Sequence, residues 1–335
     1  MLITKPAYFD DFHCTASRCP DSCCKEWDVQ VDAASAEMYR SLPGALGDRL
    51  REVLRTEDGE TVMTIIDGRC PMWRRDGLCR IQAELGEEAL CQTCREFPRL
   101  THDYGDFLER QLELSCPEAA RILLTAPMLP SISEEVPGGW EPEYEEEAMA
   151  VLKQTRKGVL ELLADGSRNV RETMALALLY GCQAQVELDG DEVRPFDAGS
   201  AMETIAEFAK PGSIRAILDF FAQLEILTPQ WEARLSGAVS SEMPEMVRNL
   251  ARYLVERYWL QAVSDYDLAC RVKFILIACL VVSALGGDFI ATAQLFSKEI
   301  ENNCGNVEAI LDAAYSHPAF TDDKLLGLLL GLEES

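Results

Sequence analysis

The sequence predicts a mainly α-helical protein in which a cysteine-rich N-terminal part with little strand precedes an all-α part. Nine of the 13 cysteines lie between residues 14 and 116, prolines and glycines are dense over 126–142, and helical periodicity prevails after residue 143. We therefore expect a cysteine-rich metal-binding domain over 1–125, a linker over 126–142 and a helical domain over 143–335.

The expected helical domain contains segments in which apolar residues recur every three or four positions. Such spacing places them on one helix face, and almost no period-two alternation interrupts it. The segments are 146–164, 168–188, 244–263, 267–285, 306–320 and 321–334. The segment 267–285 is apolar on almost every side, so we expect a buried central helix. Its most apolar run, Phe274 to Leu285, is too short to span a bilayer, so we expect no membrane contact.

The N-terminal part is less regular. The residues 49–56 favour a helix and the residues 61–67 favour a short strand. Loops bent around a metal would explain the weak periodicity of the remainder.

The chain carries a formal net charge of −26, which argues against nucleic acid as its main partner, because phosphate contacts need clustered Lys and Arg. An acidic surface serves solubility and also allows a basic, lysine-bearing partner. The N-terminus lacks the apolar run of a secretory signal, so we expect a cytoplasmic protein. An odd cysteine count in such a protein favours metal binding or redox chemistry over a disulfide framework.

The cysteine spacings are short enough for single loops to supply several ligands. Thiolates bind zinc or iron, and a tetrahedral zinc site or a four-iron cluster needs four of them. Adjacent Cys23 and Cys24 rarely both reach one ion, so one of them is expected to pack or to serve a second site. The alternative is that several thiols are buried small apolar groups. The nine are Cys14, Cys19, Cys23, Cys24, Cys70, Cys79, Cys91, Cys94 and Cys116.

The residues around these cysteines resemble the flagellin lysine-N-methylase family, which is related to small cysteine-cluster proteins described as zinc- or iron-chelating. The resemblance lies in "CxxxxCxxxCCKxW" at 14–27, "CPM…GLCRIQAELGEEAL" at 70–90, "TCREFPR" at 93–99 and "LSCPEAAR" at 114–121. Two less specific helical stretches, at 248–259 and 298–311, extend it over most of the chain.

The resemblance implies a [4Fe–4S] cluster, S-adenosylmethionine as methyl donor and lysines of flagellin as substrate. It implies metal-type roles for eight thiols, which exceeds the four that one cluster needs, so a second site, such as zinc, or structural roles are open. The family more often has a small hydroxyl residue where this chain has Cys91, so the resemblance does not include it. The eight are Cys14, Cys19, Cys23, Cys24, Cys70, Cys79, Cys94 and Cys116.

Two familiar cofactor motifs are missing from the sequence. The Cys-x3-Cys-x2-Cys pattern of radical S-adenosylmethionine enzymes fits Cys19 and Cys23 but fails at Glu26. No glycine-rich turn follows a predicted strand, because "LGGDF" at 285–289 follows a predicted helix. The sequence therefore does not locate the methyl-donor site.

Methyl transfer to lysine requires a deprotonated amine, so a carboxylate or phenol near it would help. The candidates near the motifs are Glu26, Glu96, Tyr104 and Glu113. Arg95 and Arg99 are candidates for a cofactor carboxylate or for the charge of a cluster, with ordinary ion pairing as the alternative.

Two hypotheses follow from the sequence. The first is a flagellin lysine methyltransferase with a cysteine-ligated cluster. The second is a non-catalytic zinc- or iron-chelating scaffold that binds a partner.

Overall fold

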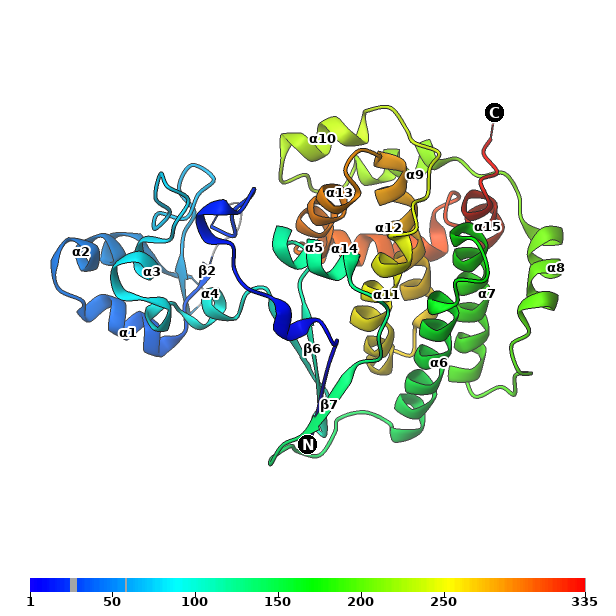
Figure 1. Ribbon diagram of the computed structural model, residues 1–335, viewed down its shortest axis with the longest axis horizontal. Helices are drawn as coiled ribbons and strands as arrows, with labels where there is room; N and C mark the ends of the chain where they lie inside the picture. The colour runs from blue at the N-terminus through cyan, green and yellow to red at the C-terminus, as the bar shows by residue number, and fades with distance from the viewer. Residues whose placement is uncertain (25–28, 58, 335) are drawn as a thin grey trace.

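The computed structural model describes residues 1–24, 29–57 and 59–334 of the chain. A small lobe built from residues 29–96 lies beside a larger helical body, and a short sheet lies between and below them (Figure 1). The strands are β1 (Leu2–Lys5), β2 (Val29–Gln30), β3 (Leu54–Glu57), β4 (Glu60–Met63), β5 (Arg99–Asp103), β6 (Phe107–Leu112) and β7 (Ile132–Glu135).

The strands form two separate sheets. In the larger sheet the order is β5-β6-β1-β7, with β1 parallel to β6 and antiparallel to β7. In the small lobe β4 lies between β2 and β3, and both pairs are antiparallel. The N-terminal strand thus pairs with β6 and with β7, which falls inside the predicted linker.

The described residues of the small lobe form four helices around their own apolar core. They are α1 (Ala33–Ser41), α2 (Gly44–Val53), α3 (Arg80–Leu85) and α4 (Gln92–Glu96), with the 3-10 turn η3 (Glu87–Ala89). Tyr39, Leu50 and Met72 are fully buried there, and the Tyr39 hydroxyl donates to the Ala89 carbonyl at 2.7 Å.

The helical body contains the remaining helices. They are α5 (Pro117–Thr125), α6 (Glu146–Ala164), α7 (Val170–Leu188), α8 (Ala198–Phe208), α9 (Ile214–Phe221), α10 (Pro229–Leu235), α11 (Val247–Tyr258), α12 (Leu268–Leu285), α13 (Phe289–Phe296), α14 (Cys304–Ser316) and α15 (Asp322–Leu330). The shorter turns are η1 (Phe9–Asp11), η2 (Ala16–Arg18), η4 (Trp259–Ser264) and the π-helical η5 (Ser297–Glu301).

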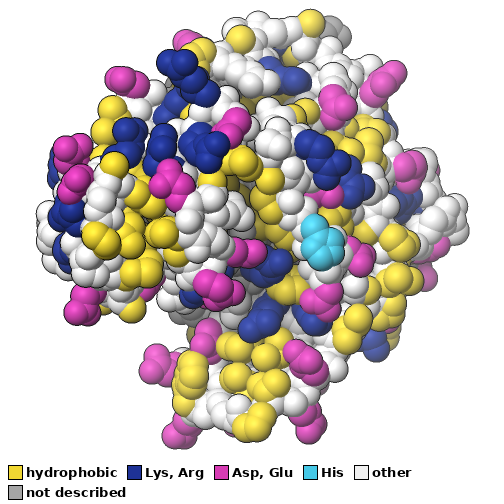
Figure 2. Space-filling model, turned by 60° about the vertical axis from the view of Figure 1, so that its left-hand side comes forward, with side chains coloured by type: hydrophobic (Ala, Val, Ile, Leu, Met, Phe, Trp, Pro, Cys, Tyr) yellow, Lys and Arg dark blue, Asp and Glu magenta, His cyan; other side chains and the backbone are white. Residues whose placement is uncertain are grey.

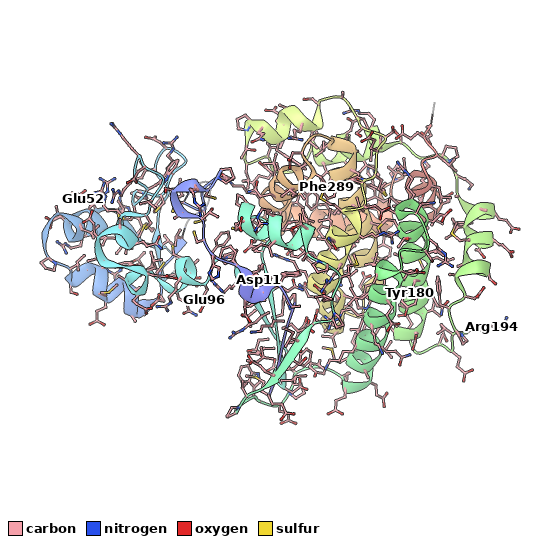
Figure 3. All side chains as sticks on the ribbon, in the orientation of Figure 1. Asp11, Glu52, Glu96, Tyr180, Arg194 and Phe289 are labelled. Atoms are coloured by element: carbon pink, nitrogen blue, oxygen red, sulfur yellow. The ribbon has the colours of Figure 1, made fainter. Side chains whose placement is uncertain are left out.

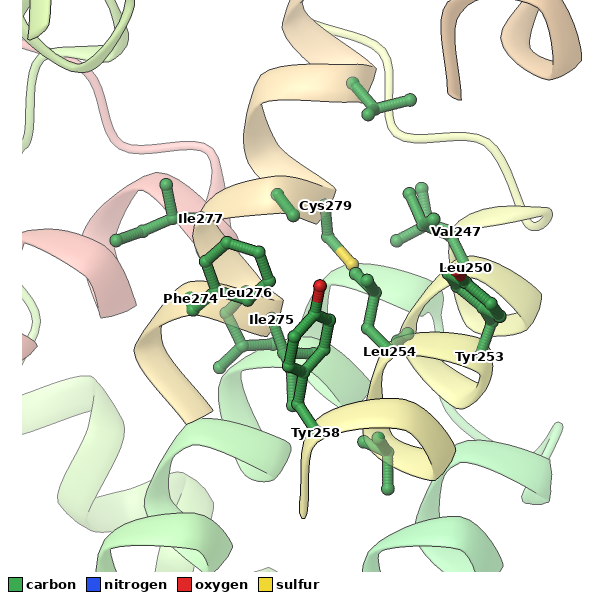
Figure 4. Close-up of a cluster of buried hydrophobic side chains, with 14 of the residues drawn as sticks. Val247, Leu250, Tyr253, Leu254, Tyr258, Phe274, Ile275, Leu276, Ile277 and Cys279 are labelled. Carbon is green, nitrogen blue, oxygen red and sulfur yellow. The ribbon is translucent and has the colours of Figure 1, made fainter. Parts of the chain in front are cut away.

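The helix α12 forms the centre of the body, as predicted. Among the described residues it is the one helix long and apolar enough to span a membrane, yet 89% of that stretch is buried inside the protein. It is longer than the twelve-residue run that the sequence singled out, so burial rather than length identifies it as a core helix. Figure 4 shows α12 packed against α11, where Tyr258 meets Phe274 edge-on with ring centroids 4.9 Å apart.

The mainly helical fold class is confirmed, and the predicted segments become α6, α7, α11, α12, α14 and α15. The strand content of the first part was underestimated, since every strand of the described residues ends by Glu135. The helix expected over 49–56 overlaps α2 only as far as Val53, because residues 54–57 form β3. The strand expected over 61–67 overlaps β4 only at 61–63. Strand β6 escaped notice because Glu109 and Gln111 occupy its buried face, which removes the usual apolar alternation.

The first part of the chain contributes to two separate apolar cores. One cluster lies wholly within the small lobe, from Val29 to Cys91. The other joins Tyr8, Phe12 and residues of β6 and α5 to the helical body. The domain boundaries expected from the sequence remain a prediction, and metal binding by the first part is likewise not established by the fold.

Candidate functional site

Six thiols lie close together, two from the loop that precedes the small lobe and four from the lobe itself. They are Cys23, Cys24, Cys70, Cys79, Cys91 and Cys94. The side chain of Cys24 hydrogen bonds with those of Cys23 and Cys70. Across from them Cys91 hydrogen bonds with Cys94, and Cys79 faces both groups. Residues far apart in the chain are thus assembled into one thiol-rich region.

Three cysteines occupy the position just before a helix. Cys79 precedes α3, Cys91 precedes α4 and Cys116 precedes α5. Each thiol receives backbone N–H groups from the first turn that follows it. Such hydrogen bonds favour the thiolate, which is the form that binds metals.

The Cys91–Cys94 pair is the most polarised of these contacts. The hydrogen bond from Cys94 lowers the pKa of Cys91 to about 7 despite burial. The same bond, followed by burial, raises the pKa of Cys94. Cys94 therefore keeps its proton more firmly than Cys91 does.

The remaining three thiols lie beside this region. Cys19 faces Cys14, while Cys116 faces both Cys19 and Cys23. Among the described residues, no group of three His, Cys, Asp or Glu side chains is arranged as it stands to hold a metal ion. Cys24 contacts both Cys23 and Cys70, and Cys91 contacts Cys94, without a set of four ligands around one point, so the ligand set remains a prediction.

The loop that carries Cys14 to Cys24 is attached to the helical body through Asp21. The Lys298 ammonium lies 3.1 Å from its carboxylate, and the Gln294 amide donates to the same oxygen at 3.2 Å. Gln294 also donates to the carbonyl of Ser115 at 2.7 Å, one residue before Cys116. The turn from α13 into η5 thus fixes both the cysteine loop and the start of α5.

A buried ion pair lies next to this attachment. Arg257 of α11 lies 3.3 Å from Glu301 of η5, whose side chain is fully buried. The Tyr253 and Tyr258 hydroxyls both donate to this carboxylate. Burial lowers the pKa of Arg257, but Tyr253, Glu301 and their neighbours outweigh it and hold that pKa well above its usual value. Half-buried Glu113 faces Arg257 and Glu301, and burial raises its pKa.

A second set of charged and polar side chains lies between the sheet and helices α6 and α11, and we call it the polar layer. It comprises His102, Glu109, Gln111, Arg156 and Glu256. Arg156 of α6 binds both carboxylate oxygens of Glu109 on β6, at 2.7 and 2.5 Å. Glu256 of α11 accepts from Arg252 at 3.0 Å. Burial, followed by the positive charge of Arg257, lowers the pKa of His102 to about 4. The carboxylate of Glu109 opposes this shift, and Arg156 adds a smaller lowering effect.

Around these sites the surface is mixed in charge. In Figure 2 Lys and Arg side chains (dark blue) lie next to Asp and Glu side chains (magenta), with apolar side chains between them.

Comparison with known proteins gives relatives at moderate identity. The chain is 32% identical over 141 residues to a flagellar biosynthetic protein FliU of Salmonella muenchen, a match that covers 40% of this chain and 83% of that protein. The chain belongs to the flagellin lysine-N-methylase family.

Two other relatives extend the comparison. Proteins named lysine-N-methylase from Salmonella choleraesuis and Salmonella typhimurium are also 32% identical over 141 residues. The match spans 35% of the length of each of them. No family model matches the chain, and no solved structure matches it.

The residues expected near the target amine lie in different parts of the structure. Glu26 lies outside the described residues. Glu96 is exposed on α4 at the border of the small lobe, where it accepts from Gln92 at 3.0 Å (Figure 3). Tyr104 is stacked on Phe107 beside the polar layer, and burial raises its pKa.

Only Glu113 lies beside the buried Arg257–Glu301 pair. Arg95 is exposed, and the guanidinium of Arg99 lies over the ring of Phe12 at 5.2 Å from its centroid. The sequence reasoning missed Arg257, Glu301, Arg156 and Glu109. For Arg257 the one signal was charge on an otherwise apolar helix, in "ARYLVERYW" at 251–259, whereas Glu109 lies on strand β6.

We predict that replacing His102 with Phe weakens the acid sensitivity of the fold. The folded pKa lies below the unfolded value near 6.5, so this histidine favours folding when neutral and loses that contribution as pH falls from about 6.5 to about 4. The variant should lose about 1–2 kcal/mol less unfolding free energy than wild type between about pH 7 and pH 5. Urea titrations at both pH values measure this, and identical losses in the two proteins would show that His102 is not held neutral.

Proposed function

We propose that the protein is a lysine N-methyltransferase that uses S-adenosylmethionine to methylate flagellin in the cytoplasm. The observation that carries the proposal is membership of a family whose named relatives are lysine-N-methylases and a flagellar biosynthetic protein. The net charge of −26 is compatible with a lysine-bearing protein substrate.

The proposed reaction needs a neutral amine. A lysine side chain with a pKa near 10.4 is mostly protonated at neutral pH, so a proton must leave before its nitrogen can act as a nucleophile. The nitrogen lone pair then forms a bond to the methyl carbon while the carbon–sulfur bond breaks, and the bonding pair stays on sulfur as S-adenosylhomocysteine. The proton passes to a nearby base and then to solvent.

Glu113 is the candidate whose surroundings suit contact with the amine. Its carboxylate is half-buried at the end of β6, accepts from the Ser115 hydroxyl at 3.1 Å and faces Glu301 as well as Arg257. Two carboxylates against one guanidinium leave an excess of negative charge, which attracts an ammonium group. We therefore assign Glu113 to binding the target amine.

We further propose that the cysteine set holds an iron–sulfur cluster of the [4Fe–4S] type, with zinc as the alternative metal. The donor chemistry fits, since the thiols converge and three of them receive helix N–H groups, while the pairwise arrangement leaves the four ligands of the cluster unassigned. The ligands would come from Cys14, Cys19, Cys23, Cys24, Cys70, Cys79, Cys94 and Cys116. When bound, the cluster would cross-link loops from distant parts of the chain.

The function is tested by incubating the purified, metal-loaded protein with radiolabelled S-adenosylmethionine and flagellin from the same bacterium. We expect methylated lysines on flagellin by mass spectrometry. Glu113→Gln should lower the rate at least about tenfold, because the amide cannot carry the charge that attracts the amine. Glu308→Gln, an exposed matched control on α14, should keep the wild-type rate.

Flagellin that stays unmethylated although the protein is fully metal-loaded would contradict the enzyme and favour the metal-binding scaffold. Equal rates in Glu113→Gln and Glu308→Gln would remove Glu113 from the site without affecting the overall activity.

The metal is tested by anaerobic purification followed by iron, sulfide and zinc analysis. Cys70→Ser and Cys94→Ser should lose metal and destabilise the small lobe, because a metal held by thiolates is coupled to folding. Cys279→Ser should keep the wild-type metal content, since Cys279 is fully buried in the core of the helical body. Unchanged metal in the first two variants would refute the ligand assignment, and zinc without iron would refute the cluster.

A further inference from the structure

The polar layer contains buried polar atoms that lack partners among the described residues. They are Gln111 Oε1 on β6, Glu256 Oε2 on α11 and His102 Nε2 on β5. Gln111 is 4% exposed and Glu256 is 8% exposed, so neither side chain can reach bulk water freely. A buried acceptor left without a donor costs about 1–3 kcal/mol. Three such atoms in one layer therefore indicate that a bound group or water donates hydrogen bonds to them.

The three side chains come from facing elements of the same layer and share neighbours. On the sheet His102 is opposite Glu109, and Gln111 is two positions further along the same face of β6. Glu256 reaches the same face from α11 and interacts with Arg156 and Glu109, the pair that also surrounds His102. The hydroxyl of Tyr253 accepts from the Leu114 N–H at 3.4 Å, which places α11 beside the end of β6.

The chemistry of the three atoms selects a donor-rich cation. Two are carbonyl or carboxylate oxygens, and a histidine kept neutral by burial can offer its ring nitrogen as an acceptor. An alkylammonium group has three N–H donors and no acceptor, which matches such a set. Burial raises the pKa of Glu256, so a bound cation would also relieve the cost of its charge.

Aromatic rings add to this environment. Tyr104 is stacked on Phe107 with centroids 4.7 Å apart, and Tyr8 lies next to Glu256 and Arg252. Ring faces attract cations. The protein's own cations already use two of these rings, because Lys153 Nζ lies 3.7 Å from the Phe107 centroid and the Arg252 guanidinium lies 5.7 Å from the Tyr8 centroid. His102 and Tyr104 are half-buried, so the edge of the polar layer borders the surface of the protein.

We propose that the polar layer between β5–β6 and helices α6 and α11 is a binding site for an alkylammonium group, with Gln111, Glu256 and His102 as its acceptors. The inference rests on the proposed function, because both reactants of that reaction have such a group. One source is the amino-acid end of S-adenosylmethionine. The other is the target lysine, in which case the polar layer rather than Glu113 would hold the target amine.

The test compares Gln111→Leu with wild type by three measurements on the full chain. Calorimetry with S-adenosylhomocysteine gives the dissociation constant of the donor side, methylation kinetics give the KM for flagellin, and thermal melting without ligand gives stability. The variant should bind one of the two ligands at least about tenfold more weakly, as expected for a lost hydrogen bond to a charged group. Its Tm without ligand should be unchanged or higher, because the unpartnered oxygen is gone.

The outcome also identifies the source of the ammonium group. Weaker S-adenosylhomocysteine binding with an unchanged KM assigns the methyl donor, and a raised KM with unchanged binding assigns the lysine. Gln230→Leu, the same change at an exposed position of α10, should alter none of the three quantities.

A Gln111→Leu protein in which both affinities are unchanged would overturn the site. A lower Tm in the same variant would show that Gln111 instead hydrogen bonds with an ordered water. A wild-type protein that binds neither ligand would instead contradict the proposed function. The two failures are therefore distinguishable.

Discussion

The buried ion pair between Arg257 and Glu301 is the interaction on which the rest of the structure depends. Two charges removed from water are tolerated only if their hydrogen-bonding capacity is met, and here Tyr253 and Tyr258 complete the carboxylate while Arg257 also donates to Tyr253 at 2.7 Å. The pair joins α11 to η5, and the Tyr253 hydroxyl joins both to the end of β6. The junction between sheet and helical body is therefore polar and specific.

The π-helical turn η5 explains how one short segment meets so many partners. A π turn rotates successive side chains away from the normal helical faces, and such turns are frequent at functional sites. Glu301 turns to Arg257, Lys298 to Asp21 in the cysteine loop, and Glu299 to Thr228 and the backbone of Leu227. The loop that carries Cys14 to Cys24 and the buried ion pair are thus held by one short segment.

The predictable parts of this protein are those encoded by local patterns. Helices α6 and α7 followed from their apolar spacing, and the buried helix α12 followed from being apolar on all sides. The short spacings predicted only that single loops supply several thiols, and the metal-type role of Cys70, Cys79 and Cys94 was implied by the family resemblance and remains a prediction. The contacts between individual thiols were not anticipated. Strand β6 was missed because Glu109 is buried on it, and its partner Arg156 comes from another element. Contacts between distant segments leave no periodic signal in a single sequence.

The direct test of this account is a double-mutant cycle on the central ion pair, using unfolding free energies of wild type, Arg257→Met, Glu301→Gln and the double variant. Each single change leaves a buried group without its partner, whereas the double change removes both. The account predicts that the double variant is more stable than the sum of the single losses implies, with a coupling of about 2 kcal/mol or more. Losses that add to within about 0.5 kcal/mol would contradict the claim that this pair organises the junction.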